Sequence, residues 1–139
     1  MKKRFLLPAL LSIFSVDAAP QKLDSLTELR WKNRIILIFS ENRESDLAML
    51  HDAKEDISDR DTLWFIVNGN ETLTNYSGTL TDSFSQNTRE RYLNADGNVL
   101  LIGKDGGVKA RGSELSLNGL FQRIDGMPMR RNEMRQKQK

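Results

Sequence analysis

The stretch "LLIGKDGGVKARG", residues 100–112, decides which kind of fold this sequence encodes. A phosphate-binding P-loop needs G-x-x-x-x-G-K-[ST] between a strand and a helix, so that backbone amides converge on the anion. Here Lys104 precedes the second glycine, no Ser or Thr follows it, and the next residues alternate like a strand. Asp105-Gly106 is instead a strong signal for a hairpin turn that needs a positive φ. The stretch therefore predicts two antiparallel strands.

The rest of the chain supplies apolar runs of strand length and amphipathic segments of helical period. The expected elements, in chain order, are helical turns over 23–29, a strand over 34–40, a four-turn helix over 42–57, a strand over 61–69, a loop over 70–81, a helix over 82–92, strands over 99–103 and 107–111, and a last helix after Ser116. No internal repeat interrupts this order.

This order predicts a single α/β domain with the thioredoxin-like arrangement, which is a mixed four-stranded sheet with helices on both faces. Strands joined through a helix are expected to run parallel with a right-handed crossover, and the last two strands form an antiparallel hairpin. The inner strands are expected at 35–39, 63–67 and 99–102. The helix residues expected to complete the core are Leu47, Leu50, Leu120, Phe121 and Ile124.

The N-terminus has the order of an export signal. A basic start precedes an apolar run from Phe5 to Val16, which is shorter than the ~20 residues of a membrane span, and Ala18 offers a cleavage site. We expect a signal peptide over 1–18, a leader over 19–22, the domain over 23–129 and a basic, polar tail over 130–139 whose end frays. Removal of the signal leaves no stable membrane span, so the protein is expected to be periplasmic or secreted. An uncleaved N-terminal anchor is the alternative.

Composition excludes several functions. None of the 139 residues is cysteine, which rules out thiol redox catalysis, cysteine nucleophiles and thiolate metal sites. Loss of Lys2, Lys3, Arg4 and Asp17 with the signal converts the formal charge of +2 to zero, so there is no general electrostatic case for nucleic-acid binding. Nucleotide and zinc signatures are also absent, and we expect no cofactor.

Two C-terminal motifs, "LLIGKDGGVKAR" and "LNGLFQRIDGMPMRRNEM", resemble the signature of domain-of-unknown-function family 4174, also called P-DUDES. "LRWKNRIILIF" and "DRDTLWFIV" extend the resemblance over about Leu23 to Met134. Members include short exported bacterial proteins, and the C-terminal domains of sushi-repeat extracellular proteins are similar. The resemblance implies a thioredoxin- or peroxiredoxin-like fold outside the cytoplasm, without a known reaction.

The resemblance also locates where redox chemistry would occur in this fold. In active thioredoxin-like proteins the redox cysteines open the helix after the first strand, where this chain has "SENRES". Asn98 stands where a cis proline usually precedes the third strand. A dithiol reaction needs a thiolate, and this sequence offers none.

Other polar groups suggest no catalytic or metal site. His51, the single histidine, is expected to be a solvated helix residue. The acidic residues between the first two long strands lack the register of a calcium loop, so a solvated helix face is the preferred interpretation; they are Asp52, Glu55, Asp56, Asp59 and Asp61. The rival enzyme hypotheses are an oxidoreductase ancestry and a metal-dependent hydrolase that uses these carboxylates.

The C-terminus "MPMRRNEMRQKQK" is the best candidate for a contact surface. Residues 123–139 carry an excess of four positive charges. The predicted binding residues are Lys104, Asp105, Arg111, Met129, Arg130, Arg131, Glu133 and Met134. They suit a non-catalytic module that binds an acidic protein or polymer of the cell envelope. The structural alternative has Met127 and Met129 sealing the sheet and the arginines pairing with Asp125 and Glu133. The oligomeric state stays open.

Overall fold

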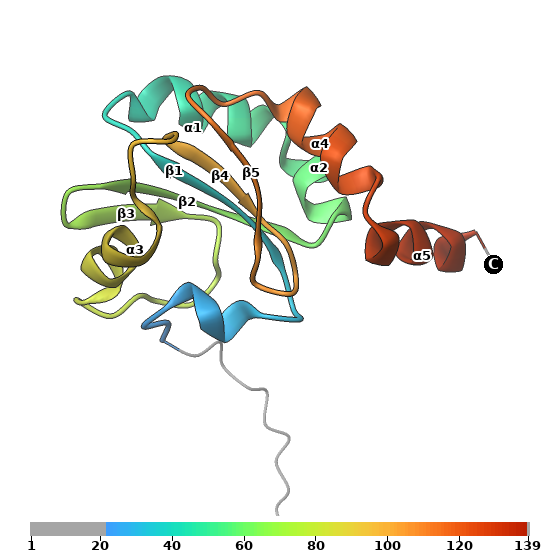
Figure 1. Cartoon of the computed structure of the whole chain (residues 1–139), viewed down its shortest axis with the longest axis horizontal. Coiled ribbons are helices and arrows are strands. Elements are labelled where there is room, and N and C mark those ends of the chain that lie inside the picture. The colour runs from blue at the N-terminus through green and yellow to red at the C-terminus, as the bar shows by residue number, and fades with distance from the viewer. Residues whose placement is uncertain (1–21, 139) are drawn as a thin grey trace, which may run out of the picture.

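The computed structural model describes residues 22–138, so the predicted signal peptide over 1–18 and most of the predicted leader lie outside it. The described chain forms one sheet with helices on both sides (Figure 1). The elements are η1 (Leu26–Leu29), β1 (Arg34–Phe39), α1 (Arg43–Asp52), α2 (Lys54–Asp59), β2 (Thr62–Asn68), β3 (Glu71–Thr74), α3 (Phe84–Tyr92), β4 (Val99–Ile102), β5 (Val108–Gly112), α4 (Leu117–Asp125) and α5 (Pro128–Lys137).

The sheet is mixed and has five strands in the order β3-β2-β1-β4-β5. The α/β class and the three predicted inner strands are confirmed, and the architecture is compatible with a thioredoxin-like fold. The predicted count of four strands is wrong, because the presumed loop over 70–81 contains β3. Gly69 adopts a φ of 60° and lets the chain turn back at once, so that Asn68 pairs with Glu71. Gly69-Asn70, the two residues between this pair, was the sequence signal for the hairpin.

The extra strand also changes the direction of β4. The sequence predicted that β4 runs parallel to the earlier inner strands, but it pairs antiparallel with β1. β3 reverses the chain after β2, and α3 then leads from β3 to β4. The strands that α3 joins run in the same direction, as strands connected through a helix usually do. The prediction was wrong only because β3 was missed.

Two apolar clusters show that both faces of the sheet are covered. One face packs against η1 and α3, with Leu29 and Phe84 among its buried residues. The other packs against α1, α2 and α4, where Leu50 and Ile124 are fully buried. Alternate residues of a strand point to opposite faces, so β1 supplies both clusters through its continuous apolar run. The predicted core is confirmed for Leu50, Phe121 and Ile124, and Leu47 and Leu120 pack at its margin.

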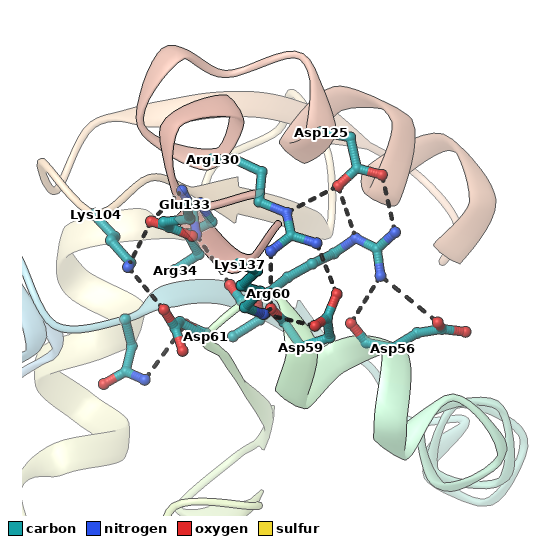
Figure 2. Close-up of polar contacts among 12 residues, drawn as sticks. Arg34, Asp56, Asp59, Arg60, Asp61, Lys104, Asp125, Arg130, Glu133 and Lys137 are labelled. Carbon is teal, nitrogen blue, oxygen red and sulfur yellow. Dashed lines mark hydrogen bonds and ion pairs between the residues drawn. The ribbon is translucent and has the colours of Figure 1, made fainter. Parts of the chain in front are cut away.

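Two helical predictions need correction. The single helix expected over 42–57 is two helices, α1 and α2, separated at Ala53. The C-terminal residues expected to fray form α5, which begins at Pro128. Proline is favoured in the first turn of a helix because the amide that it lacks has no helical partner there. α5 therefore starts a new direction after α4 and lies beside the end of α2 (Figures 1 and 2).

Residues 100–112 form the hairpin that the sequence predicted. β4 and β5 pair antiparallel, and the Gly103 amide donates to the Gly107 carbonyl over 2.9 Å. Gly106 has a φ of 87°, the left-handed conformation that the Asp105-Gly106 signal predicted. A strand follows the turn instead of a helix, so the stretch has no P-loop geometry.

Candidate functional site

The C-terminal helix α5 is held to the domain by charged side chains (Figure 2). Arg130 is only 3 % exposed and is the buried residue of α5. Its guanidinium donates to the carboxylates of Asp59 and Asp125 over 2.7 and 3.1 Å and to the Asp59 carbonyl over 2.9 Å. Lys137, the last residue of α5, donates to the Asp59 carboxylate over 2.7 Å. These contacts join α5 to the ends of α2 and α4.

A second group of charges fixes the other side of α5. Glu133 accepts two hydrogen bonds from Arg34, over 3.1 and 3.2 Å, and one from Lys104 over 2.9 Å. Arg34 is 1 % exposed and also donates to the Arg60 carbonyl over 3.0 Å. Lys104 reaches Asp61 over 3.0 Å. Sequence analysis missed Arg34, although a basic residue at the start of a fully apolar strand was a usable signal.

The acidic residues that sequence analysis considered for a cation serve this network. Asp59 and Asp61 bind the basic side chains already described, and Asp56 lies 3.7 Å from Arg60. Asp52 and Glu55 are exposed to solvent. Within residues 22–138 no three His, Asp or Glu side chains are grouped so that they could hold a metal ion.

The network shifts the pKa values of its carboxylates. Hydrogen bonds from Lys137 and Arg130 lower the pKa of Asp59 to about 2. Burial would raise the pKa of Glu133, but the hydrogen bonds from Arg34 and Lys104 outweigh it and the pKa falls. The same balance, with Arg60 and Arg130 as donors, lowers the pKa of Asp125. All three groups are therefore charged in the folded protein at neutral pH.

Of the eight predicted binding residues, Lys104 and Glu133 are in direct contact and Arg130 is buried. Asp105 accepts from the Gly107 amide and from Lys109 within the hairpin, and Arg111 donates to the Tyr92 carbonyl. Met129 is 43 % exposed, and Met134 is half-buried. The side chain of Arg131 is exposed and has no polar partner among residues 22–138.

The contacts of α5 match the structural alternative in part. Arg130 pairs with Asp125, as that alternative predicted, and Met127 packs against the core. Glu133 pairs with Arg34 and Lys104 instead of with an arginine of its own helix. Because Arg130 and Glu133 are engaged inside the protein, Met129 and Arg131 are the predicted binding residues of α5 whose side chains are exposed to a partner.

A cleft of about 770 Å³ lies where the parallel strands β1 and β2 end. Arg34 and its contacts with α5 lie at the other end of β1. Ligands of α/β proteins commonly bind at the carboxyl ends of parallel strands. The walls come from the start of α1, the end of β2, α3, the start of β4 and the segment after β5. "SENRES" and Asn98, the positions where this fold carries its redox site, both line it. The chain is held here by the Phe39 amide, which donates to the Asn98 carbonyl over 2.8 Å.

The side chains of this cleft suit recognition. Its lining contains the carboxylates of Glu41, Asp46 and Glu114 and a single basic residue, Arg89, whose guanidinium donates to the Gly69 carbonyl. Two exposed apolar side chains lie at its margin, Met49 at 38 % and Leu93 at 46 % exposure. Sequence analysis named none of these residues as a site, because they come from segments far apart in the chain.

Among the described residues 22–138, no base is hydrogen-bonded to a serine that lines the cleft. Serine hydroxyls line it, but a serine nucleophile needs a base within hydrogen-bond reach. His51 lines a different hollow beside the buried Trp64, with the two ring centroids 6.0 Å apart. The single histidine is exposed, as predicted. The polar groups that line the cleft can form hydrogen bonds and ion pairs with a ligand.

The fold and the cleft define a class of protein: a cysteine-free α/β domain, compatible with a thioredoxin-like fold, with a polar cleft where its parallel strands end. The family model for a domain of unknown function, DUF4174, matches residues 25–133, and the chain belongs to this family. A search of curated proteins and a search of solved structures each found no match. The family match ends at Glu133, so it includes Arg34, Lys104 and Arg130 of the network that holds α5.

Proposed function

We propose that this protein is an exported, non-catalytic module that binds a segment of another protein in the cleft at the end of β1 and β2. The cleft carries the proposal, because its volume of about 770 Å³ is in the range of ligand sites. It combines apolar margins with polar groups, which suits a peptide better than a small apolar ligand. The described part of the chain, residues 22–138, contains no helix that is long and apolar enough to cross a bilayer.

Charge indicates the kind of segment that fits. Three carboxylates face the cleft, and Arg89 is occupied by the Gly69 carbonyl. A basic side chain on the partner would complement Glu41, Asp46 and Glu114, while Met49 and Leu93 would cover an apolar neighbour. The ligand we propose is therefore an extended segment with basic and apolar residues.

Site-specific photo-crosslinking in the native host tests this. We expect a crosslinker at Leu93 to capture a partner, and a crosslinker at the exposed Asp52 to capture none. Glu41→Lys with Glu114→Lys should abolish the capture. The matched control, Asp52→Lys with Glu55→Lys, changes the net charge equally on exposed residues of α1 and α2 and should retain it. Equal capture from Leu93 and Asp52 would refute the cleft as the binding surface.

The acidic partner predicted from the C-terminus is a second candidate. It now rests on Arg131 and on the exposed Met129, since Arg130 and Glu133 are engaged within the domain. A crosslinker at the exposed Asn132 tests this surface in the same experiment. Capture from Asn132 that is lost in Arg131→Ala, without capture from Leu93, would favour this surface over the cleft.

Export is a separate part of the proposal. It rests on the basic, apolar and small-residue order of residues 1–18. The intact mass of the protein from its native host should correspond to a chain that begins at Ala19. A mass that includes Met1 to Ala18 would contradict cleavage and support the uncleaved anchor.

A further inference from the structure

Trp31, in the turn between η1 and β1, combines two unfavourable features. Its φ of 70° lies in the left-handed region that bulky residues rarely adopt, and its side chain is 63 % exposed. The backbone is held there by the Trp31 amide, which donates to the Lys104 carbonyl over 2.6 Å. The indole has no hydrogen bond, ring contact or cation contact with any residue of the described range 22–138. Packing within the domain therefore does not explain this tryptophan.

Basic and apolar side chains surround it. Arg30 and Lys32 are exposed and have no ionic partner in the described chain. Arg30 lies against the hairpin turn, since a Cβ placed on Gly106 would be 3.0 Å from its Nε. Val108 is 40 % exposed and is the cross-strand partner of Ile102, so it lies on the sheet face that η1 covers. We call Arg30, Trp31, Lys32 and Val108 the Trp31 surface.

This combination matches the interface between water and a lipid bilayer. Tryptophan is enriched at the headgroup level, where its ring is half in an apolar environment and its N–H can still find a partner. Nearby arginine and lysine side chains are attracted to anionic headgroups, by about 1 kcal/mol each close to the surface. Val108, two residues after the Gly106 that Arg30 faces, adds exposed apolar area.

The position in the fold agrees with this partner. Trp31 lies just after η1, which ends at Leu29, and just before β1, which begins at Arg34. β1 begins just after Trp31 and ends at the cleft. The Trp31 surface and the cleft therefore lie at opposite ends of strand β1.

We propose that the Trp31 surface docks this domain onto an anionic lipid surface, with the cleft directed away from the membrane. The docking is peripheral and involves headgroups only. It goes beyond the proposed function, because it assigns a second surface with a different partner. Two cations and one indole give weak binding.

Co-sedimentation with vesicles tests the proposal on the protein purified from its host. The vesicles contain equal parts phosphatidylglycerol and phosphatidylcholine, or phosphatidylcholine alone. We expect Arg30→Gln with Lys32→Gln to lower the partition coefficient on the anionic vesicles roughly thirtyfold and to abolish the lipid preference. The matched control, Lys54→Gln with Arg135→Gln, removes two exposed cations that lie outside the Trp31 surface and should leave binding unchanged.

Trp31→Gly gives an independent test. Glycine tolerates the positive φ, so the melting temperature should stay unchanged or rise while vesicle binding falls severalfold. Met49→Gly, which removes an exposed apolar side chain beside the cleft, is its control for binding. A lowered melting temperature in Trp31→Gly with unchanged vesicle binding would make Trp31 structural and overturn the proposal. Binding to a polyglutamate resin without binding to anionic vesicles would also overturn it, in favour of an acidic protein partner.

Discussion

At the scale of single residues, two arginines show how burial decides the role of a charge. Arg130 and Arg131 are neighbours in sequence and were assigned the same function from it. The first points into the domain and is 3 % exposed, while the second is exposed. A donor on a buried guanidinium costs stability when it has no partner, and Asp59 and Asp125 accept from Arg130. Arg130 is thus a stabilising residue, and Arg131 is free to contact a partner.

Single substitutions should separate these roles. We expect Arg130→Ala to lower the free energy of unfolding by about 2 kcal/mol, because it removes charge-assisted hydrogen bonds to two partly exposed carboxylates. Arg131→Ala should change it by less than about 0.5 kcal/mol. Urea unfolding monitored by circular dichroism measures both. Equal effects of the two substitutions would mean that α5 is oriented differently from the structure described.

At the scale of elements, α5 differs from the other helices in how it is attached. The other α-helices have apolar or aromatic residues in the core, whereas the buried residue of α5 is an arginine. Its contacts with α2, α4 and the start of β1 are therefore mainly electrostatic. Paired charges hold a helix only while both partners are ionised, so the docking of α5 depends on pH.

Acid should weaken this docking. The pKa of Asp59 falls from its ordinary value of 3.8 to about 2 in the folded protein, so folding favours its ionised form. The resulting stability is complete above pH 3.8 and is lost as the pH falls toward about 2; Asp125 and Glu133, with lowered pKa values, act in the same direction. Urea unfolding of the wild type and of Asp59→Asn between pH 7 and pH 2 measures this. The difference between them should shrink in acid, and a difference independent of pH would contradict it.

A cavity at the inner strand β4 should lower the stability of the protein. Leu101 is fully buried between β1 and β5, so Leu101→Ala should lower the free energy of unfolding by about 2–5 kcal/mol. Val108→Ala in the neighbouring β5 is the control, because that side chain is 40 % exposed and should cost far less. Chemical denaturation of both variants gives the comparison. A cost near zero for Leu101→Ala would show that the strand is placed incorrectly.

At the scale of the whole molecule, the two ends of strand β1 carry surfaces that differ in charge. The end at which β1 and β2 finish carries the acidic cleft, and the end at which β1 begins carries the Trp31 surface. The C-terminal network lies near the beginning of β1, through Arg34 and Lys104. Binding and docking are thus assigned to opposite ends of β1, and the fold keeps them apart.

We expect the protein to lack the thiol-dependent redox activity of thioredoxin-like proteins. Purified protein is expected to show no insulin reduction and no peroxide consumption, since a sequence without cysteine provides no thiolate. A heat-killed sample sets the background of each assay, and an active thioredoxin verifies the reagents. Turnover above that background would require a different redox group and would overturn the non-catalytic assignment.

Elemental analysis of the purified protein tests the remaining enzyme hypothesis, the metal-dependent hydrolase. We expect no stoichiometric metal, because Asp56, Asp59 and Asp61 are paired with Arg60, Arg130, Lys137 and Lys104. A Lys104→Ala variant with Arg130→Ala serves as a comparison in which two of these carboxylates lose a partner. Stoichiometric metal in the wild type would contradict the assignment of these residues to the network.

The sequence by itself determined the properties that depend on local pattern. Continuous apolar runs located β1, β2 and β4, and helical periodicity located α3 and α4. Asp105-Gly106 determined the hairpin, because few residues other than glycine adopt the required φ of 87°. The missing cysteine excluded thiol chemistry, because composition alone decides whether a thiolate can form.

The tertiary structure decided what depends on residues distant in the chain. β3 is short and only partly buried, so its pattern was weak, and it forms because β2 offers an open edge. The pairing of Arg34 with Glu133 joins the first strand to the last helix, and no local signal predicts such a contact. The cleft likewise draws its walls from five separate segments. Burial and charge pairing are set by which segments meet in space, and therefore only the folded chain shows that Arg130 is held inside while Trp31 is exposed.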